Sequence, residues 1–167
     1  MQKITPCLWF DTQAEDAAAF YTSVFASSRI LDVLRYGEAG PGPEGSVLTV
    51  RFELDGQEFV ALNGGPHFTF NEAISFQVNC GGQDEVDHYW DRLSEGGEES
   101  QCGWLKDRYG VSWQIIPTRL SELLGDPDPG RSQRAMQAML QMQKIEIATL
   151  EQAADSATST PREPTAR

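Results

Sequence analysis

The chain has 167 residues, of which 40% are hydrophobic and 23% charged, and its formal net charge is −12. These values are typical of a soluble globular protein with one domain, and the excess of acidic residues disfavours nucleic acid and anionic membranes as partners. Three cysteines without CxxC spacing, together with the absence of a signal peptide or a membrane-spanning apolar run, predict a cytoplasmic protein.

The chain begins with a predicted strand over residues 4–10, followed by an amphipathic helix that ends near Phe25. Three strand-like runs come next, ILDVLRY, SVLTVRFEL and EFVALN, separated by Gly-rich or Asp-Gly turns. The order then repeats: ISFQVN predicts a strand, QDEVDHYWDRLSEGG predicts a helix, and three short strands run to Pro117.

The repeated strand–helix–three-strand order predicts an internal duplication. Aligning Phe20 with Tyr89 brings both helices into line, and aligning Gly56 with Gly110 sets EFVAL against SWQII. We expect an α+β fold of two tandem βαβββ modules that form a curved, cup-like sheet with the helices outside. The predicted ranges within one domain of residues 1–155 are 1–66 for the first module, 72–117 for the second and 118–155 for a helical extension, followed by a mobile tail at 156–167.

Two further segments have plain structural interpretations. Residues 40–45, GPGPEG, fit the G-x-G-x-x-G pattern of a phosphate-binding loop. They lead into a strand rather than a helix, however, so we interpret them as a flexible turn. From Ser132 to Ala154 the sequence predicts one long helix, and its apolar stripe is typical of packing against the domain or a partner subunit.

Several stretches together resemble one superfamily: the duplicated unit, the FYTSVF helix, DHYWDRLSEGG and CGWLKDRYGVSWQIIP. They are similar to the vicinal oxygen chelate superfamily, which includes glyoxalase I, fosfomycin and bleomycin resistance proteins and extradiol dioxygenases. The resemblance extends over residues 1–155 and favours the PhnB-like branch, often labelled 3-demethylubiquinone-9 3-methyltransferase. It implies paired sheets forming a cup, a divalent metal in the enzymes, and assembly as a homodimer.

In the metalloenzymes of that superfamily, two ligands lie fourteen residues before the helix aromatic and two lie four residues after the last hairpin glycine. The corresponding positions here are Pro6, Ser75, Val60 and Gln114. Proline and valine side chains cannot bind a metal, and serine and glutamine offer only neutral oxygens. We therefore expect no metal in the cup, and no glyoxalase or dioxygenase chemistry. We also expect no cofactor, because the doubly wound domain and Gly-rich turn usual for S-adenosylmethionine are missing from the sequence.

Strand alternation predicts which side chains face the cup. The apolar residues of each strand form one face, and the polar residues form the other. The candidate ligand-binding residues on the polar face are Thr49, Arg51, Ser75, Gln77 and Gln114. An arginine there can select a carboxylate or phosphate. Alternatively, this face is simply solvated, and Arg51 pairs with Glu53 of a neighbouring chain or with another acid.

Other reactive residues are weaker candidates. His67, in the loop between the modules, is a catalytic acid–base candidate, although a lone loop histidine is more often simply exposed. We expect Cys7 and Cys80 to be buried and unreactive. The charged segment KDRYG predicts the polar end of a hairpin, with Asp107 solvated or paired rather than catalytic.

The sequence thus supports three hypotheses. The first is a PhnB-like protein that binds a small polar or anionic molecule in a metal-free cup. The second is a metal-independent enzyme of the transferase or isomerase type that uses His67. The third is a non-catalytic dimeric interaction module whose Met-rich C-terminal helices make the contact. All three include a homodimer, and none identifies the ligand.

Overall fold

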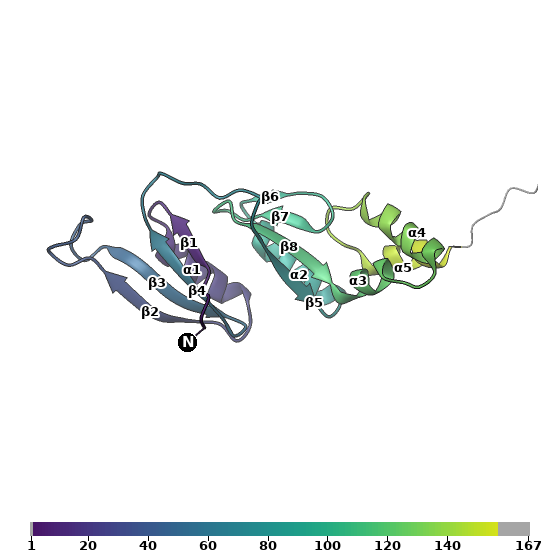
Figure 1. Ribbon diagram of the computed structural model, residues 1–167, viewed down its shortest axis with the longest axis horizontal. Helices are drawn as coiled ribbons and strands as arrows, with labels where there is room; N and C mark the ends of the chain where they lie inside the picture. Colours follow the sequence, from purple (N-terminus) through teal and green to yellow (C-terminus); the bar gives the residue numbers. More distant parts are fainter. Residues whose placement is uncertain (1, 157–167) are drawn as a thin grey trace, which may run out of the picture. The chain divides into compact units, whose positions relative to one another are not determined.

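The computed structural model describes residues 2–156 (Figure 1). The chain divides into two compact units, and the first consists of residues up to 75 together with 92–98 and 106–112. The second unit contains the remainder of the described chain. Residues 157–167, which make up most of the predicted mobile tail, lie outside the described residues. Within residues 2–156, none of the helices combines the length and the apolar character needed to cross a bilayer.

The first sheet has the strand order β1-β4-β3-β2. Its elements are β1 (Cys7–Phe10), α1 (Ala14–Val24), β2 (Arg29–Arg35), β3 (Val47–Leu54) and β4 (Gln57–Asn63). Strand β1 runs parallel to β4, and the other neighbours are antiparallel. Alternate residues of β3 are buried, among them Val50 and Phe52, and α1 contributes the buried Ala17, Ala18 and Tyr21. The alternating apolar pattern therefore produces one buried face, as predicted.

The first turn of helix α1 lies beside the end of β4, because Asn63, the last residue of β4, binds the first residue of the helix. The Oδ1 atom of Asn63 accepts a hydrogen bond from the backbone N–H of Ala14 at 2.9 Å, and its Nδ2 donates to the carbonyl of Val47 at 3.1 Å. Glu15 and Asp16 lie in the first turn, where negative charge is favourable to the helix dipole. One side chain thus joins the helix to two strands.

The second sheet has the strand order β5-β8-β7-β6 and carries one long helix. Its elements are β5 (Ser75–Cys80), α2 (Gln83–Ser94), β6 (Glu98–Glu99), β7 (Trp104–Lys106) and β8 (Ser112–Pro117). Helix α2 buries Val86, Trp90 and Leu93, which follow helical spacing. The predicted α+β fold with two tandem βαβββ modules and C-terminal helices is confirmed.

The GPGPEG segment connects β2 to β3, so it joins two strands, as predicted. Its first two glycines lie against the ring of Tyr36: a Cβ added at Gly40 or Gly42 would meet ring carbons at 2.5 Å. The glycines therefore permit the loop to pack over an aromatic ring, and no helix follows to offer a phosphate site.

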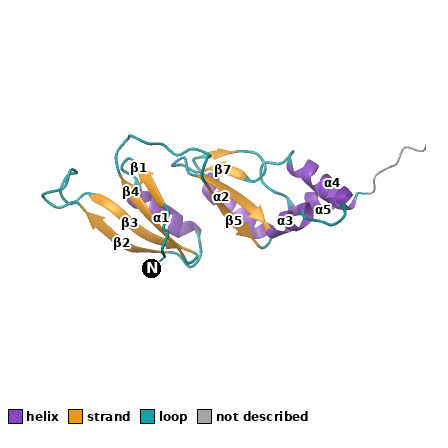
Figure 2. Cartoon of the chain, viewed as in Figure 1, coloured by secondary structure: helices purple, strands orange, loops and turns teal. Residues whose placement is uncertain are grey.

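Three C-terminal helices follow the second sheet and pack together (Figure 2). They are α3 (Thr118–Leu124), α4 (Pro129–Met139) and α5 (Ile147–Asp155). The single long helix predicted from Ser132 onward is wrong, because the chain breaks between α4 and α5. Carbonyls in that break accept hydrogen bonds from elsewhere: Met142 from the N–H of Cys102, and Gln143 from the N–H of Gly103, both at 2.8 Å. Tertiary hydrogen bonds therefore replace the helical ones.

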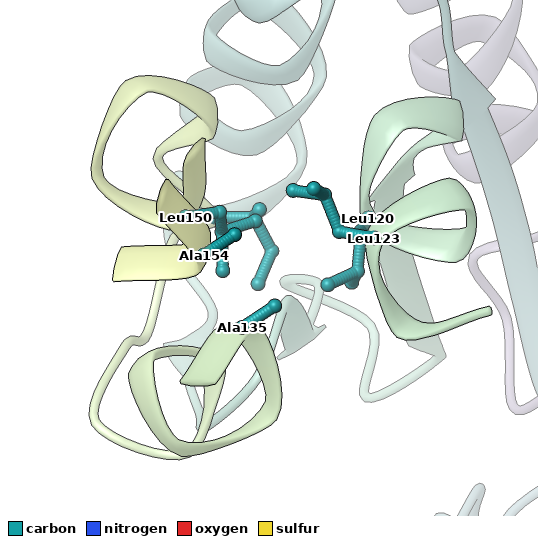
Figure 3. Packing of buried hydrophobic residues seen from close by; sticks show 6 residues of the cluster. Leu120, Leu123, Ala135, Leu150 and Ala154 are labelled. Carbon is teal, nitrogen blue, oxygen red and sulfur yellow. The ribbon is translucent and has the colours of Figure 1, made fainter. Parts of the chain in front are cut away.

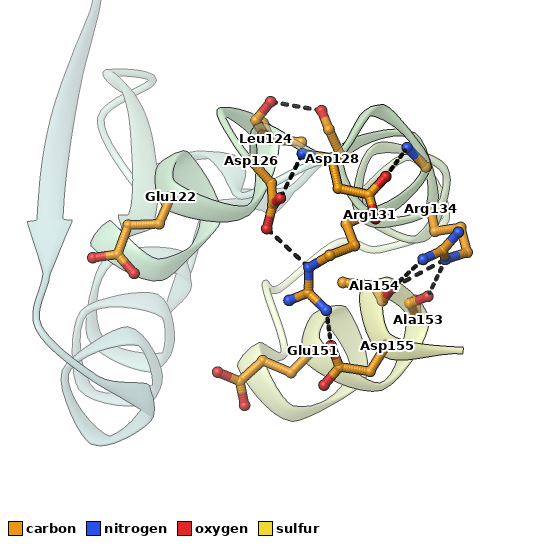
Figure 4. A network of polar contacts seen from close by, with 12 residues as sticks. Glu122, Leu124, Asp126, Asp128, Arg131, Arg134, Glu151, Ala153, Ala154 and Asp155 are labelled. Carbon is orange, nitrogen blue, oxygen red and sulfur yellow. Dashed lines mark hydrogen bonds and ion pairs between the residues drawn. The ribbon is translucent and has the colours of Figure 1, made fainter. Parts of the chain in front are cut away.

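These helices enclose a core of their own (Figure 3). Its buried members are Leu120, Leu123, Ala135, Ile145, Leu150 and Ala154, and Ile116, Met139 and Met142 pack against them. Arginines connect the helix ends on the outside: Arg131 pairs with Asp126 and Asp155, and Arg134 donates to the carbonyl of Ala154 (Figure 4). The extension thus has both an apolar interior and a polar network at its surface.

Candidate functional site

The candidate residues of the first sheet lie on the face opposite its core, which we call the non-core face. On β3 this face carries Thr49, Arg51 and Glu53, all half-buried. The Nη2 atom of Arg51 donates to Oε2 of Glu58 at 3.0 Å, and 40% of the Arg51 side chain remains exposed. Glu53 lies 3.7 Å from Arg29 instead. The acid that pairs with Arg51 is therefore Glu58 on the neighbouring strand.

The pairing with Glu58 leaves N–H donors of Arg51 available for a ligand. A guanidinium has five N–H donors in a planar fork, and one bond to Glu58 orients it without using the others. Glu58 also offsets part of the positive charge of Arg51, which weakens the local attraction for anions. The arrangement is suited to a small group that accepts hydrogen bonds and carries little net charge.

The remaining candidates lie in the second sheet. Ser75 and Gln77 belong to β5, and Gln114 belongs to β8, which is the hydrogen-bonded neighbour of β5. Gln114 lies between the buried Trp113 and Ile115, so it is on the non-core face. Gln77 is exposed, and its Nε2 donates to Oδ1 of Asn79 at 2.8 Å. The five candidates therefore form two sets, one on each sheet.

The superfamily's metal positions can be compared with the strand register. Strands β1 and β4 place Cys7 opposite Val60, while Pro6 precedes β1 and accepts a hydrogen bond from the N–H of Val60 at 2.9 Å. The side chain that shares the face of Val60 is thus Cys7, one residue later than the counting rule indicates. One thiol beside a valine, with Ser75 and Gln114 at the other two positions, does not fit a divalent metal. Within residues 2–156, no group of three or more His, Cys, Asp or Glu side chains is arranged to hold a metal ion.

The cysteines differ from one another in exposure. Cys80 is buried, as expected, and burial followed by the charge of Glu85 raises its pKa to about 12. Cys7 is exposed, so the expectation that it is buried is wrong. Its place on the non-core face of an outer strand explains the difference. Partial burial nevertheless raises the pKa of Cys7, which disfavours the thiolate needed for nucleophilic attack.

His67 lies in an exposed turn that follows β4, outside the strands of both sheets. The Pro66–His67 turn leads into Phe68, whose ring contacts Trp9.

A buried carboxylate was missed by the sequence interpretation. Asp107 in the β7–β8 turn is 2% exposed, and the hydroxyl of Tyr21 donates to its Oδ2 at 2.6 Å. Its Oδ1 accepts from the backbone N–H groups of Tyr109 and Val111. Burial, and then the charge of Asp107, raise the pKa of Tyr21 well above its usual value. The sequence did contain a signal for this contact: Tyr21 lies on the apolar face of the predicted first helix. A buried tyrosine hydroxyl needs a hydrogen-bond partner.

Two of the pockets formed by the described residues lie in the first unit. The larger has a volume of about 670 Å³ and lies beside the first turn of α1 and the loop after Tyr36. The smaller, of about 330 Å³, lies beside Trp9 and Phe68. The five predicted ligand residues do not line either of these two pockets.

Comparison with known proteins identifies the family. Residues 2–116 match the family described as 3-demethylubiquinone-9 3-methyltransferase. The PhnB protein from Bacillus cereus, whose name carries the same description, is 40% identical; the match covers 70% of this chain and all of that one, with a TM-score of 0.65. Protein PA1353 from Pseudomonas aeruginosa shares the fold at 20% identity and a TM-score of 0.59, covering 70% of this chain and 98% of that one. No match was found among curated proteins.

The family match ends at residue 116, one residue before β8 does. The similarity that we expected to continue through the extension is therefore shown only for the two modules. The match covers more than half of the chain, and the structure contains the duplicated unit. The chain belongs to the PhnB-like, 3-demethylubiquinone-9 3-methyltransferase family of the vicinal oxygen chelate superfamily.

Proposed function

We propose that this chain is a PhnB-like protein that binds a small polar or anionic molecule without a metal. The observation that carries the proposal is the half-buried Arg51 on the non-core face, oriented by Glu58 and retaining donors for a ligand. The second sheet, considered by itself, carries the other candidates, Ser75, Gln77 and Gln114, on its non-core face. A half-buried arginine recognises a carboxylate or phosphate oxygen more strongly than an exposed one does.

The surrounding charges narrow the ligand class. Glu58 contacts Arg51, Asp32 is its register partner on β2, and the chain carries a net charge of −12. A polyanion would be repelled by these carboxylates. A molecule with one carboxylate or phosphate oxygen directed at Arg51, and hydroxyl or amide groups elsewhere, fits better.

The proposal includes neither metal chemistry nor methyl transfer. The donor set at the superfamily's ligand positions does not fit a divalent cation. The two modules provide no doubly wound sheet with a Gly-rich strand-to-helix turn, on which S-adenosylmethionine is usually bound. We further propose a homodimer, as the superfamily resemblance implies, and a cytoplasmic location, as the cysteine pattern suggests.

Native mass spectrometry of the purified chain tests this function. We expect a dimer that retains a small-molecule mass, absent from the denatured spectrum, and no stoichiometric metal. Arg51→Ala should lose the retained molecule, because it removes the donors that face it. Arg29→Ala is the matched control: Arg29 also pairs with an acid, but 69% of its side chain is exposed. That variant should keep the molecule.

Two results would contradict the proposal. A divalent metal bound at one per chain would mean that ligands outside the superfamily positions assemble a metal site. Equal retention of the small molecule by the Arg51→Ala and Arg29→Ala variants would remove Arg51 from the site.

A further inference from the structure

The smaller pocket of the first unit is built mainly from aromatic rings. Its volume is about 330 Å³, and its lining includes Trp9, Phe68, Phe70 and Tyr109. Trp9 and Phe68 meet edge to face, with ring centroids 5.0 Å apart and planes at 78°. The pocket thus presents several π systems at steep angles to one another in a small space.

The position of Trp9 is fixed by its surroundings. Its Nε1 donates to the carbonyl of Gly65 at 2.9 Å. A Cβ on Gly64 would lie 2.2 Å from Cζ2 of the indole, so only glycine leaves room for the ring in this position. The indole is therefore held in place before any ligand binds, which lowers the entropic cost of binding.

A carboxylate adds negative charge to the same pocket. Asp11 is exposed and belongs to the lining of this pocket as well as of the larger one. Arg108, next to Tyr109, lies with its guanidinium 4.2 Å from the ring centre of Phe20 and pairs with Glu95 at 3.5 Å. The guanidinium of Arg108 is thus already engaged by Phe20 and Glu95.

We propose that this pocket binds a small alkylammonium ion. Electron-rich ring faces attract a cation, and arrays of aromatic rings recognise quaternary ammonium groups in this way. The Asp11 carboxylate adds Coulomb attraction, and the net charge of −12 raises the local concentration of cations. The site is separate from the Arg51 face, since it shares none of the five residues assigned there and would take a ligand of the opposite charge.

Choline and its uncharged isostere 3,3-dimethyl-1-butanol provide the test, in a ligand-observed NMR titration of the full chain. Choline should bind, and the alcohol should bind about tenfold more weakly or not at all, since only the cation gains from the rings. Phe68→Ala should weaken choline binding about threefold or more while leaving the fold intact, because this side chain is already 65% exposed.

Three additional variants distinguish an effect at the pocket from a general effect of net charge. Asp11→Asn should weaken choline binding, whereas Asp84→Asn, which makes the same change in net charge at an exposed position on α2, should not. Gly64→Ala should also weaken binding, because it displaces the indole. Equal affinity for choline and the alcohol, equal effects of the two aspartate variants, or the absence of choline binding would each overturn the proposal.

Discussion

Replacing Asp107 with alanine is expected to destabilise the first unit by about 3–5 kcal/mol. The Asp107 side chain accepts hydrogen bonds from the hydroxyl of Tyr21 and from the N–H groups of Tyr109 and Val111. Alanine would leave these donors without their acceptor in an interior where Tyr21 is 1% exposed. An unsatisfied buried donor costs about 1–3 kcal/mol, so several of them together account for the expected loss.

Urea denaturation followed by circular dichroism measures this loss. Tyr21→Phe is the matched control, because it removes one hydroxyl and leaves Asp107 bound by the backbone, at an expected cost of about 1–2 kcal/mol. The Asp107→Ala loss should therefore be clearly the larger of the two. A loss below about 1 kcal/mol for Asp107→Ala would show that water replaces the missing carboxylate.

The raised pKa of Tyr21 also predicts a loss of stability at alkaline pH. The folded chain holds the Tyr21 proton more tightly than the unfolded chain, whose tyrosine pKa is about 10. Above that pH the unfolded state releases the proton first, so the free energy of unfolding falls as the pH rises. Below it, this contribution is fully present. The slope above pH 10 should be shallower in Tyr21→Phe; an unchanged slope would assign the pH dependence to other groups.

Replacing Leu150 with alanine is expected to remove about 2–5 kcal/mol from the stability of the C-terminal helices. Leu150 is fully buried among Leu120, Leu123 and Ala154 (Figure 3). Alanine leaves a cavity in addition to the lost transfer energy of the removed methyl groups. The effect should be large because the extension has only a small core, to which each leucine makes a substantial contribution.

Leu140→Ala is the control for Leu150→Ala, since it makes the same chemical change on a side chain that is 54% exposed. Its cost should stay within about 0.5 kcal/mol, as is usual for surface substitutions. The two variants are compared by thermal denaturation followed by circular dichroism. Similar shifts for both would mean that the helices do not pack around Leu150 as described.

Two predictions were wrong for the same physical reason: the single helix over residues 132–154 and the burial of Cys7. Both depend on contacts between segments that are distant in the sequence. Residues 132–154 have helical apolar spacing throughout, yet the carbonyls of Met142 and Gln143 bind the N–H groups of Cys102 and Gly103. Those partners are about forty residues away in sequence, and local periodicity contains no information about them. Similarly, the exposure of Cys7 depends on β1 being an outer strand of its sheet.

The sequence by itself determined the duplication, the α+β class and the buried faces of β3, β5 and β8, because these follow from periodicities of two and 3.6 residues. It also determined that GPGPEG joins two strands. Only the tertiary structure decided which acid pairs with Arg51 and which buried hydroxyl contacts Asp107. It also brought Trp9 beside Phe68. These contacts join residues whose spacing along the chain follows no period, so strand register and loop packing determine them rather than local pattern.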